Sequence, residues 1–410
     1  MSTASRSKTT VHLRAGNVQP IWAGHPWVYA QAIARVDGDK PTPGDEVRVV
    51  DPHANLLGRG FWSPRQAIPV RLVTHDDEVD LDDKAWLIAR LQNAVARRRA
   101  LGLPDVSTNG FRLMHAEGDE VPGLVIDRFG TDEAGKGGVA VVQAGTAGLR
   151  RRAAQLAAAI EEVLAPIAVL DRTPVSVAKG EGFELDESLD RGEHVSVLSF
   201  RERGFEFAIP SDLAQKTGFY FDQRGLRARV EALSKDRRVL DAYCYVGPIA
   251  MAAARGGARS VLALDDSMRA LEVASACSKT NGLEIRFERA DVRKELPVRA
   301  ARGERFDLVV LDPPKLAPKR GDRDAALGYQ TKLVEQAAAL VDPGGILVVC
   351  SCSTAIGPSE LARSLAIGAR KAGRSATVLE RLGQGGDHPV PAAFPEGIYL
   401  STLIAELGSR

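Results

Sequence analysis

From Arg237 to the C-terminus, short apolar runs alternate with longer stretches in which apolar residues recur every three or four positions. The short runs are apolar throughout, as in parallel strands buried on both faces, and the longer stretches have the spacing of amphipathic helices. Seven strands are predicted, at 237–243, 260–265, 285–291, 306–314, 344–353, 376–382 and 399–407. Strict alternation of strand and helix predicts an α/β fold with a Rossmann-like, doubly wound sheet.

A different pattern fills residues 11–74. Short runs that alternate apolar and polar residues are separated by glycine and proline turns, most clearly at 44–50, 56–62 and 67–73. Alternation with a period of two indicates strands with one exposed face, and several short strands predict a small β-barrel.

Between these two regions, helices and strands are mixed. Helices are predicted at 80–101 and 147–163, and strands at 111–117, 123–129 and 138–144. A chain of 410 residues is too long for one core. We therefore predict three domains, a β-barrel at 1–75, a small α+β domain at 76–195 and the doubly wound domain at 196–410.

Charge and cysteine content narrow the function classes. Lys and Arg number 54 against 53 Asp and Glu, so the whole chain has no basic excess, although residues 1–75 carry nine basic and five acidic side chains. The N-terminus is polar, and no apolar run reaches 18 residues. We therefore predict neither a signal peptide nor a membrane-spanning segment. All four cysteines follow residue 243 without zinc-ligand spacing, which predicts a reducing, cytoplasmic location and no metal.

Acidic residues end four successive predicted strands. Asp241, Asp265, Asp291 and Asp312 end the first four strands of the C-terminal region, and Gly247 follows the first strand. In open α/β sheets, ligands bind beyond the carboxyl ends of the strands, where the strand order reverses. A carboxylate after the second strand can accept both hydroxyls of a ribose, and glycine lets a ligand approach the backbone. The pattern predicts a site for S-adenosylmethionine, with Asp291 at the adenine edge.

A dinucleotide-dependent dehydrogenase is the main alternative for such a fold. It needs Gly-x-Gly-x-x-Gly after the first strand to hold a pyrophosphate. Here that stretch reads CYVGPIAMAA and contains a single glycine, Gly247. The sequence therefore favours a methyltransferase.

Cys350 and Cys352 lie at the end of the fifth predicted strand. Alternate strand residues point to the same face, and Cys352 is nearer the carboxyl end, where a substrate has to arrive. Addition of a thiolate to C6 of a pyrimidine makes C5 nucleophilic, so Cys352 is the candidate for covalent catalysis. A protonated Asp312 on the adjacent strand can hydrogen-bond the N3 edge of the base. The alternative is that both cysteines are small buried strand residues, the usual environment of cysteine.

Methylation of adenine N6 is another chemistry associated with an Asp-Pro-Pro motif. It uses an aromatic residue after the prolines, which stacks on the flipped base. This chain has Lys315 in that position, with no Phe or Tyr in the KLAPKRG that follows. Methylation of a ring carbon is therefore favoured.

Three blocks of sequence carry a resemblance to a known family. They are GHPWVY at 24–29, HAEGDEVPGLVIDR at 115–128, and a third block that runs from QKTGFYFDQR at 215–224 through LDPPK and CSCS to DHP at 387–389 and FPE at 394–396. Together they resemble the large-subunit ribosomal RNA cytosine-C5 methyltransferase I family over nearly the whole chain.

The resemblance implies an N-terminal PUA domain (an RNA-binding barrel), a central EEHEE domain and a C-terminal S-adenosylmethionine-dependent methyltransferase domain. It implies 5-methylcytosine formation in RNA, either 23S ribosomal RNA or a large-subunit assembly intermediate, and leaves open whether the chain forms a homodimer. It implies Cys352 as nucleophile with Asp312 beside it. The cofactor site would comprise Asp241, Tyr243, Gly247, Asp265, Asp291 and Asp312. RNA contacts are expected from Trp27, Lys216, Arg224 and Lys315.

The chain departs from the family pattern at three places. Val246-Gly247-Pro248 stands where Thr-Gly-Gly is expected, Lys315 where two-cysteine relatives carry a second cysteine, and Ala355-Ile356 where relatives tend to carry His. Two alternatives to 5-methylcytosine formation are methylation of another RNA base atom, such as uracil C5 or an exocyclic nitrogen, and a non-catalytic RNA-binding or ribosome-assembly factor. A scaffold needs neither Cys352 nor Asp312, which favours an enzyme.

Overall fold

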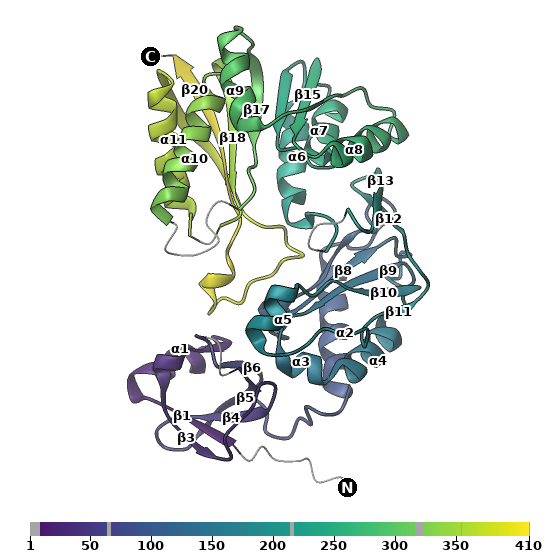
Figure 1. Cartoon of the computed structure of the whole chain (residues 1–410), viewed down its shortest axis with the longest axis vertical. Helices are drawn as coiled ribbons and strands as arrows, with labels where there is room; N and C mark the ends of the chain where they lie inside the picture. The colour runs from purple at the N-terminus through teal and green to yellow at the C-terminus, as the bar shows by residue number, and fades with distance from the viewer. Residues whose placement is uncertain (1–8, 64–66, 214–216, 316–322, 354, 410) are drawn as a thin grey trace. The chain divides into compact units, whose positions relative to one another are not determined.

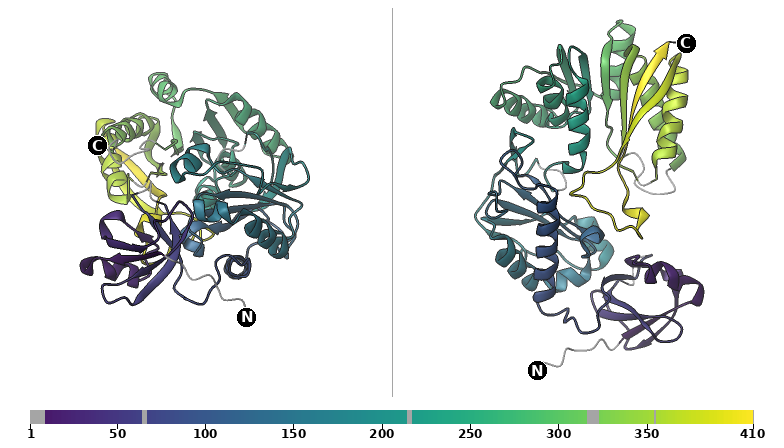
Figure 2. Two further views of the ribbon diagram at one scale, coloured as in Figure 1. Left: turned by 60° about the horizontal axis from the view of Figure 1, so that its bottom comes forward. Right: turned by 180° about the vertical axis from the view of Figure 1, so that it is seen from behind.

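The computed structural model describes residues 9–63, 67–213, 217–315, 323–353 and 355–409. By its contacts the chain divides into two compact units. Unit 1 consists of Met1–Phe221 with Gly386–Gly397, and unit 2 of Asp222–Gly385 with Ile398–Arg410. The chain can be followed by colour in Figure 1 and Figure 2. In the part of the chain described, no helix is both long and apolar enough to cross a membrane.

Unit 1 begins with a six-stranded sheet of order β2-β6-β5-β4-β1-β3. Its elements are β1 (Thr9–Leu13), α1 (Val18–Trp22), β2 (Trp27–Val28), β3 (Ile33–Gly38), β4 (Glu46–Val50), β5 (Leu56–Trp62) and β6 (Val70–Thr74). Alternate residues of β4, Val47 and Val49, are buried in its core, as the period of two predicted. Strands β5 and β6 approach closely at Gly60, where a Cβ would lie 2.0 Å from the carbonyl oxygen of Arg71. This strand pair therefore requires a glycine.

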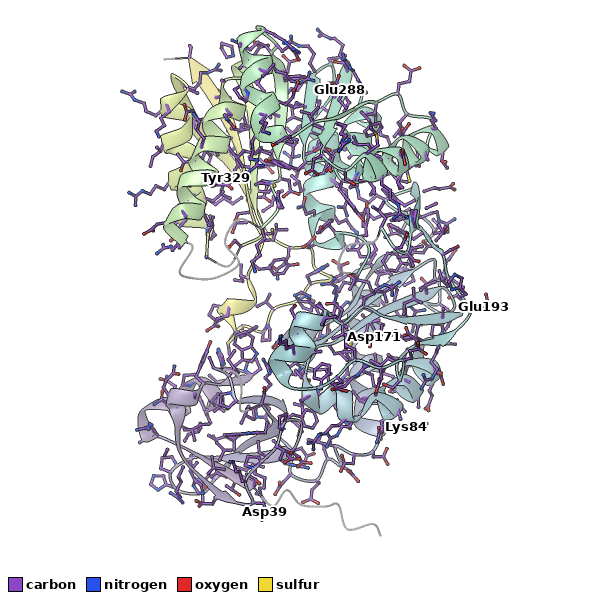
Figure 3. The ribbon with its side chains drawn as sticks, in the orientation of Figure 1. Asp39, Lys84, Asp171, Glu193, Glu288 and Tyr329 are labelled. Atoms are coloured by element: carbon purple, nitrogen blue, oxygen red, sulfur yellow. The ribbon has the colours of Figure 1, made fainter. Side chains whose placement is uncertain are left out.

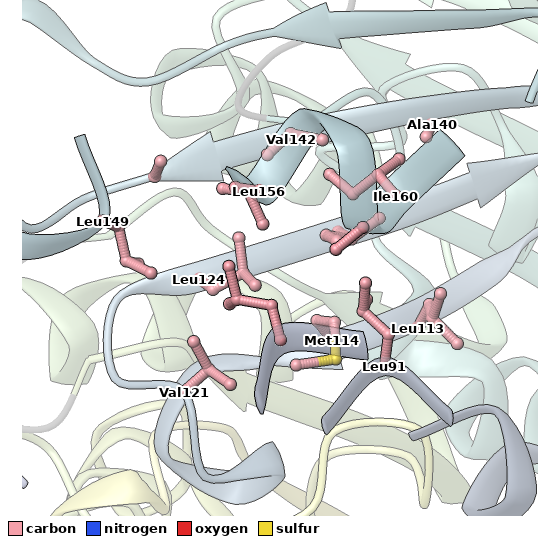
Figure 4. Close-up of a cluster of buried hydrophobic side chains, with 14 of the residues drawn as sticks. Leu91, Leu113, Met114, Val121, Leu124, Ala140, Val142, Leu149, Leu156 and Ile160 are labelled. Carbon is pink, nitrogen blue, oxygen red and sulfur yellow. The ribbon is translucent and has the colours of Figure 1, made fainter. Parts of the chain in front are cut away.

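A second sheet of unit 1 has five strands in the order β11-β10-β9-β8-β7. Its elements are α2 (Ala85–Ala100), β7 (Phe111–His115), β8 (Leu124–Phe129), β9 (Val139–Ala144), α3 (Ala147–Arg151), α4 (Ala153–Leu164), β10 (Ala168–Asp171), α5 (Val175–Glu181) and β11 (Arg191–Gly192). Leu91 of α2 and Leu156 and Ile160 of α4 pack with Met114 and Leu124 of the sheet (Figure 4). Helices thus pack on this sheet, as the mixture of predicted helices and strands indicated.

The hairpin of β12 (Val197–Glu202) and β13 (Phe205–Pro210) also belongs to unit 1. The rings of Phe200 and Phe207 stack with centroids 5.1 Å apart, and Phe219 packs against both rings. The predicted boundaries between the three domains stay a prediction.

Unit 2 contains a seven-stranded sheet of order β16-β15-β14-β17-β18-β20-β19. Its strands are β14 (Arg238–Ala242), β15 (Ser260–Asp265), β16 (Arg286–Arg289), β17 (Phe306–Leu311), β18 (Val341–Ser351), β19 (Arg374–Leu382) and β20 (Ser401–Ser409). All neighbouring pairs are parallel except those that involve β20. The predicted α/β fold with a doubly wound sheet is confirmed.

Helices cover both faces of this sheet (Figure 1). They are α6 (Arg224–Leu233), α7 (Pro248–Arg255), α8 (Met268–Thr280), α9 (Val292–Ala301), α10 (Arg323–Ala338) and α11 (Pro358–Lys371). Val239 and Val310 pack in a core with α6, α7 and α8, whereas Leu240 and Leu311 pack with α9, α10 and α11. Because successive strand residues face opposite sides, strands covered on both faces are apolar throughout, as the sequence showed.

The segment Gly386–Gly397 belongs to unit 1 although the chain on either side belongs to unit 2. Asp387 in this segment is buried, and its carbonyl oxygen accepts an N–H of Arg98 at 2.8 Å. Its carboxylate accepts the backbone N–H of Arg112 at 3.2 Å and pairs with His388 at 3.0 Å. Burial, with a contribution from His388, lowers the pKa of His115 to about 2, so this neighbouring ring is neutral. The segment thus completes a buried polar network in unit 1.

Candidate cofactor and catalytic site

The strand order of unit 2 reverses between β14 and β17, and their carboxyl ends lie side by side. Asp241 pairs with Val310, and Val310 pairs with Val348 of β18. Residues paired in a parallel sheet face the same side, and every second residue repeats that side. Asp241, Asp312 and Cys350 are therefore directed to the face that α6, α7 and α8 cover. Ligands of such folds bind at this point.

Asp241 is the most deeply buried of the predicted cofactor carboxylates, with 1% exposure. Neither of its carboxylate oxygens forms a well-aligned hydrogen bond within the described part of the chain. The nearby backbone N–H of Ala250 lowers its pKa, but by less than burial raises it. Burial and the nearby Asp312 and Asp265 raise its pKa to about 8. A buried, unpaired carboxyl costs free energy, so this site fits a ligand that brings positive charge. The sulfonium and ammonium groups of S-adenosylmethionine are such charges.

The loop after β14 has a strained backbone. Tyr243, Tyr245 and Gly247 have φ angles of +70°, +52° and +77°, in the left-handed region that glycine adopts without cost. A Cβ at Gly247 would lie 3.1 Å from the ring of Phe287, so a close neighbour also favours glycine. Pro248 occupies the first turn of α7, where a missing N–H leaves no helical bond unmade. Strain of this kind concentrates at functional sites.

Asp265 ends β15, and backbone N–H groups hold its carboxylate. Oδ1 accepts the N–H of Ser267 and Oδ2 accepts the N–H of Tyr245, both at 2.9 Å. Burial raises the pKa of Asp265 despite these two bonds. Each carboxylate oxygen has two lone pairs, so Asp265 can still accept the hydroxyls of a ribose.

Asp291 and Tyr243 are connected through two residues that the sequence did not single out. Asp291 caps α9, accepts the backbone N–H of Arg293 at 3.2 Å and pairs with its guanidinium at 3.1 Å. This hydrogen bond with Arg293 lowers the pKa of Asp291. The guanidinium carbon lies 6.0 Å from the ring centre of Tyr329, which is labelled in Figure 3. Burial, and next the nearby Tyr329, raise the pKa of Tyr243.

The two cysteines of the fifth strand differ in environment. Cys350 is fully buried in β18, where its sulfur accepts the hydroxyl of Thr402 at 3.4 Å. Burial, and next Asp312, raise the pKa of the Cys350 thiol well above its usual value. Cys352 is half-buried and follows β18, which ends at Ser351 rather than at the predicted residue 353. Cys352, which is nearer the carboxyl ends of the strands, is therefore the more accessible of the two cysteines.

Asp312 directly follows β17, and its carboxylate has a partner that the sequence did not single out. Gln223 precedes α6, is 6% exposed and donates from Nε2 to Oδ2 of Asp312 at 2.7 Å. Gln223 belongs to the FDQR motif at 221–224, which is part of the family resemblance.

The four predicted RNA-binding residues lie in different parts of the chain. Trp27 is in unit 1, and Arg224 and Lys315 are in unit 2. Arg224 is the half-buried first residue of α6, and Lys315 is exposed after the Asp-Pro-Pro motif. Lys216 lies outside the described residues.

Trp27 is engaged within unit 1. Its indole N–H donates to Glu117 Oε1 at 2.8 Å, and its ring lies 4.5 Å from that of Phe394. Trp22, at the end of α1, is 76% exposed. An exposed indole is available for stacking on a base, and Trp22 is not among the RNA-binding residues predicted from the sequence.

Comparison with known proteins agrees with this description. Residues 11–75 match the model of a PUA-like domain, and residues 183–397 match the model of an S-adenosylmethionine-dependent methyltransferase. The chain is 35% identical over 401 residues to the ribosomal RNA large subunit methyltransferase I of Tolumonas auensis, covering 97% of this chain and 98% of the relative. It is 34% identical over 392 residues to the protein of that name from Escherichia coli O139:H28, covering 95% and 96%.

Solved structures show the same fold. An S-adenosylmethionine-dependent methyltransferase structure from Streptococcus mutans has a TM-score of 0.80 at 16% identity and covers 97% of this chain and 99% of its own. A methyltransferase crystallised with S-adenosylhomocysteine also has a TM-score of 0.80, at 17% identity and with the same coverage. The predicted PUA-type and methyltransferase domains are therefore confirmed, and S-adenosylmethionine is the cofactor of the latter.

Proposed function

The chain belongs to the ribosomal RNA large subunit methyltransferase I family, and on this premise we propose that it forms 5-methylcytosine in 23S ribosomal RNA. The observation that carries the proposal is the half-buried Cys352 just beyond β18, while Asp312 directly follows the neighbouring strand β17. A methyltransferase of an exocyclic nitrogen needs no thiol there. The RNA substrate implies that the enzyme works in the cytoplasm.

On the cofactor side, S-adenosylmethionine supplies an electrophilic methyl group on a positively charged sulfur. We assign Asp241 to the positive charge, because its buried oxygens lack well-formed partners in the described structure. Asp265 would bind the ribose and Asp291 the adenine edge. Tyr243 and Gly247 would form the loop beneath the cofactor, whose carboxylate can meet the N-terminal N–H groups of α7.

On the base side, the thiolate of Cys352 adds to C6 of a flipped cytosine while the carboxyl proton of Asp312 is donated to N3. As the C6–S bond forms, the C5=C6 electron pair shifts to C4=C5 and the C4=N3 pair takes the proton. The C4=C5 pair would then form the bond from C5 to the methyl carbon, and the bond from that carbon to sulfur would break. A general base removes the C5 proton, the C6–S bond breaks, and N3 returns its proton to Asp312. Cys350 is unsuited to this role, because its raised pKa keeps it a thiol.

On the RNA side, the PUA-like domain has a local excess of basic residues, which favours phosphate contacts. We assign base stacking there to the exposed Trp22 in addition to the predicted Trp27. Arg224 and Lys315, at the start of α6 and after β17, would hold the backbone of the target strand. Lys216 stays a sequence-based prediction.

The nucleophile is tested by comparing Cys352→Ala with Cys350→Ala. Cys352→Ala should lose methyl transfer at least about 10²-fold while it keeps cofactor and RNA affinity, because only the covalent step is removed. Cys350→Ala, the matched control in the same strand, should retain most activity. The readouts are tritium transfer to 23S ribosomal RNA and calorimetric binding of S-adenosylmethionine.

Trapping gives a second readout. RNA that contains 5-fluorocytosine should form a complex with the wild type that survives denaturation, because fluorine cannot leave C5 as a proton. The Cys352→Ala protein should form none. A Cys352→Ala enzyme as active as wild type would refute the covalent mechanism and favour methylation of a nitrogen.

A further inference from the structure

Gln223 is a buried glutamine on the side of the proposed site where the base would bind. It is buried at 6% exposure, and its Nε2 donates to Oδ2 of Asp312 at 2.7 Å. A buried amide that makes such a bond is held in one orientation, because breaking the bond would leave a polar group without a partner. The contact joins the start of α6 to the end of β17, two elements far apart in sequence.

The backbone of Gln223 is fixed by its neighbour Asp222. The carbonyl oxygen of Asp222 accepts the N–H of Gly385 at 2.8 Å, and its Oδ2 accepts the hydroxyl of Tyr399 at 2.7 Å. On the other side, Leu226 of α6 is buried in the core of unit 2. The backbone of Gln223 is therefore fixed on both sides. Its side chain loses little further conformational entropy when its amide hydrogen-bonds Asp312.

We propose that Gln223 is a positioning residue that fixes which oxygen of Asp312 carries the proton during methyl transfer. This inference rests on the proposed function, in which Asp312 donates to N3 of cytosine. An oxygen that accepts an N–H acts as the carbonyl oxygen of a protonated carboxyl group. Since Oδ2 accepts from Gln223, the proton resides on Oδ1, which transfers it to N3 as the thiolate adds and receives it back when the C6–S bond breaks.

The proposal separates two substitutions of similar size. Gln223→Met keeps the volume and removes the donor, so Asp312 can carry its proton on either oxygen and lose its orientation. Gln223→Glu places a second carboxyl group against Oδ2. Two adjacent carboxyl groups share one proton, which would occupy the Glu–Oδ2 contact and leave Oδ1 without its proton at neutral pH.

The experiment measures single-turnover methyl transfer to in vitro transcribed 23S ribosomal RNA over a range of pH with the full-length protein. Gln223→Met should slow the chemical step by about tenfold or more, with cofactor and RNA dissociation constants within about twofold of wild type. Gln223→Glu should be slow near neutral pH and recover at lower pH, so that its pH optimum shifts down by about one unit or more.

Gln330→Met is the matched control. Gln330 is a fully buried glutamine of unit 2 whose Nε2 donates to the carbonyl oxygen of Cys350 at 3.3 Å. This variant reports the cost of losing a buried amide hydrogen bond elsewhere in the same unit, and its pH profile should coincide with that of wild type.

Two outcomes would overturn the proposal. One is a Gln223→Met enzyme with the wild-type single-turnover rate. The other is a pH profile of Gln223→Glu that coincides with wild type, which would make Gln223 merely structural. Nucleoside mass spectrometry of the wild-type product distinguishes these from a failure of the proposed function. A product without 5-methylcytidine overturns both proposals, whereas 5-methylcytidine together with unaltered Gln223 variants overturns this one alone.

Discussion

Both units of this protein bury carboxylates, but they surround them differently. In unit 1, Asp119 accepts both arms of Arg98, at 2.5 and 2.8 Å, and the backbone N–H of His115 at 2.7 Å. In unit 2, Asp241 is as deeply buried but has no well-aligned hydrogen bond within the described residues, and its pKa is about 8. A buried carboxylate with all its partners maintains the fold, whereas burial without them keeps Asp241 largely protonated and suits a ligand that brings positive charge. Asp119 is therefore a structural carboxylate, and Asp241 is the carboxylate that we propose for binding.

Removing a carboxylate of the first kind should have the largest effect on stability. Asp119→Ala leaves Arg98 buried at 1% exposure without its ion-pair partner. We expect the free energy of unfolding to fall by about 3–5 kcal/mol. Urea denaturation followed by tryptophan fluorescence measures it, and calorimetry should show unchanged affinity for S-adenosylmethionine below the transition. A loss under about 1 kcal/mol would mean that the network contributes little.

Removing the carboxylate of Asp241 should instead raise the stability of the cofactor-free protein at high pH. The pKa of Asp241 is about 8 in the folded protein and about 3.9 in an unfolded chain. The folded state therefore binds more protons between these values, and the wild type loses stability as pH rises from about 4 to about 8. Asp241→Asn removes this loss, so the cofactor-free variant should be more stable than wild type above pH ~8, by a margin that falls to zero toward pH ~4.

The same variant should bind S-adenosylmethionine more weakly, because a neutral amide does not attract a positive charge. Thermal melts at both ends of this pH range and titration calorimetry test the two halves of the prediction. A melting temperature below that of wild type at high pH would show that the carboxylate of Asp241 stabilises the fold, as the carboxylate of Asp119 does.

A surface pair should show the smallest effect. Lys84 and Glu162 join α2 and α4 at 2.7 Å, with side chains 47% and 52% exposed (Figure 3 labels Lys84). Exposed ion pairs contribute little, because solvent and salt screen them. Lys84→Met should leave the urea midpoint unchanged within error. A clear drop in that midpoint would show that exposure does not account for the difference between Asp119 and this pair.

The order of strands and helices in unit 2 was predictable because strands covered on both faces are apolar without interruption. The start of β18 was not. The sequence predicts a beginning at Gly344, since Asp342-Pro343-Gly344 looks like a turn, but β18 begins at Val341. Val341 pairs with Phe306, and the register then shifts so that Ile346 pairs with Leu308. The residues of β18 between Val341 and Ile346 are accommodated by this irregular pairing. The shift depends on the partner strand β17, so the sequence of β18 alone does not predict it.

The site divides in the same way. The places of Asp241, Asp265 and Asp312 at the carboxyl ends of strands were predictable, because such ends converge at one edge of a doubly wound sheet. Gln223 and Tyr329 were not, because each reaches the site from a helix region whose position depends on side-chain packing. Asp312, the partner of Gln223, and Tyr243, whose pKa Tyr329 helps to raise, could be singled out without them. Sequence periodicity locates the edge of a sheet, but it does not say which polar side chains arrive from other elements.

The segment Gly386–Gly397 gives the order of synthesis a structural meaning. A ribosome adds Asp387 to the chain 289 residues after Arg98, yet Asp387 supplies an acceptor to Arg98. Domains made first usually fold first during translation. Here the buried polar network of unit 1 stays incomplete until the segment Gly386–Gly397 has left the ribosome. A chain that stops before residue 386 would carry an unfinished interior in its first half, which exposes truncated products to chaperones and proteases.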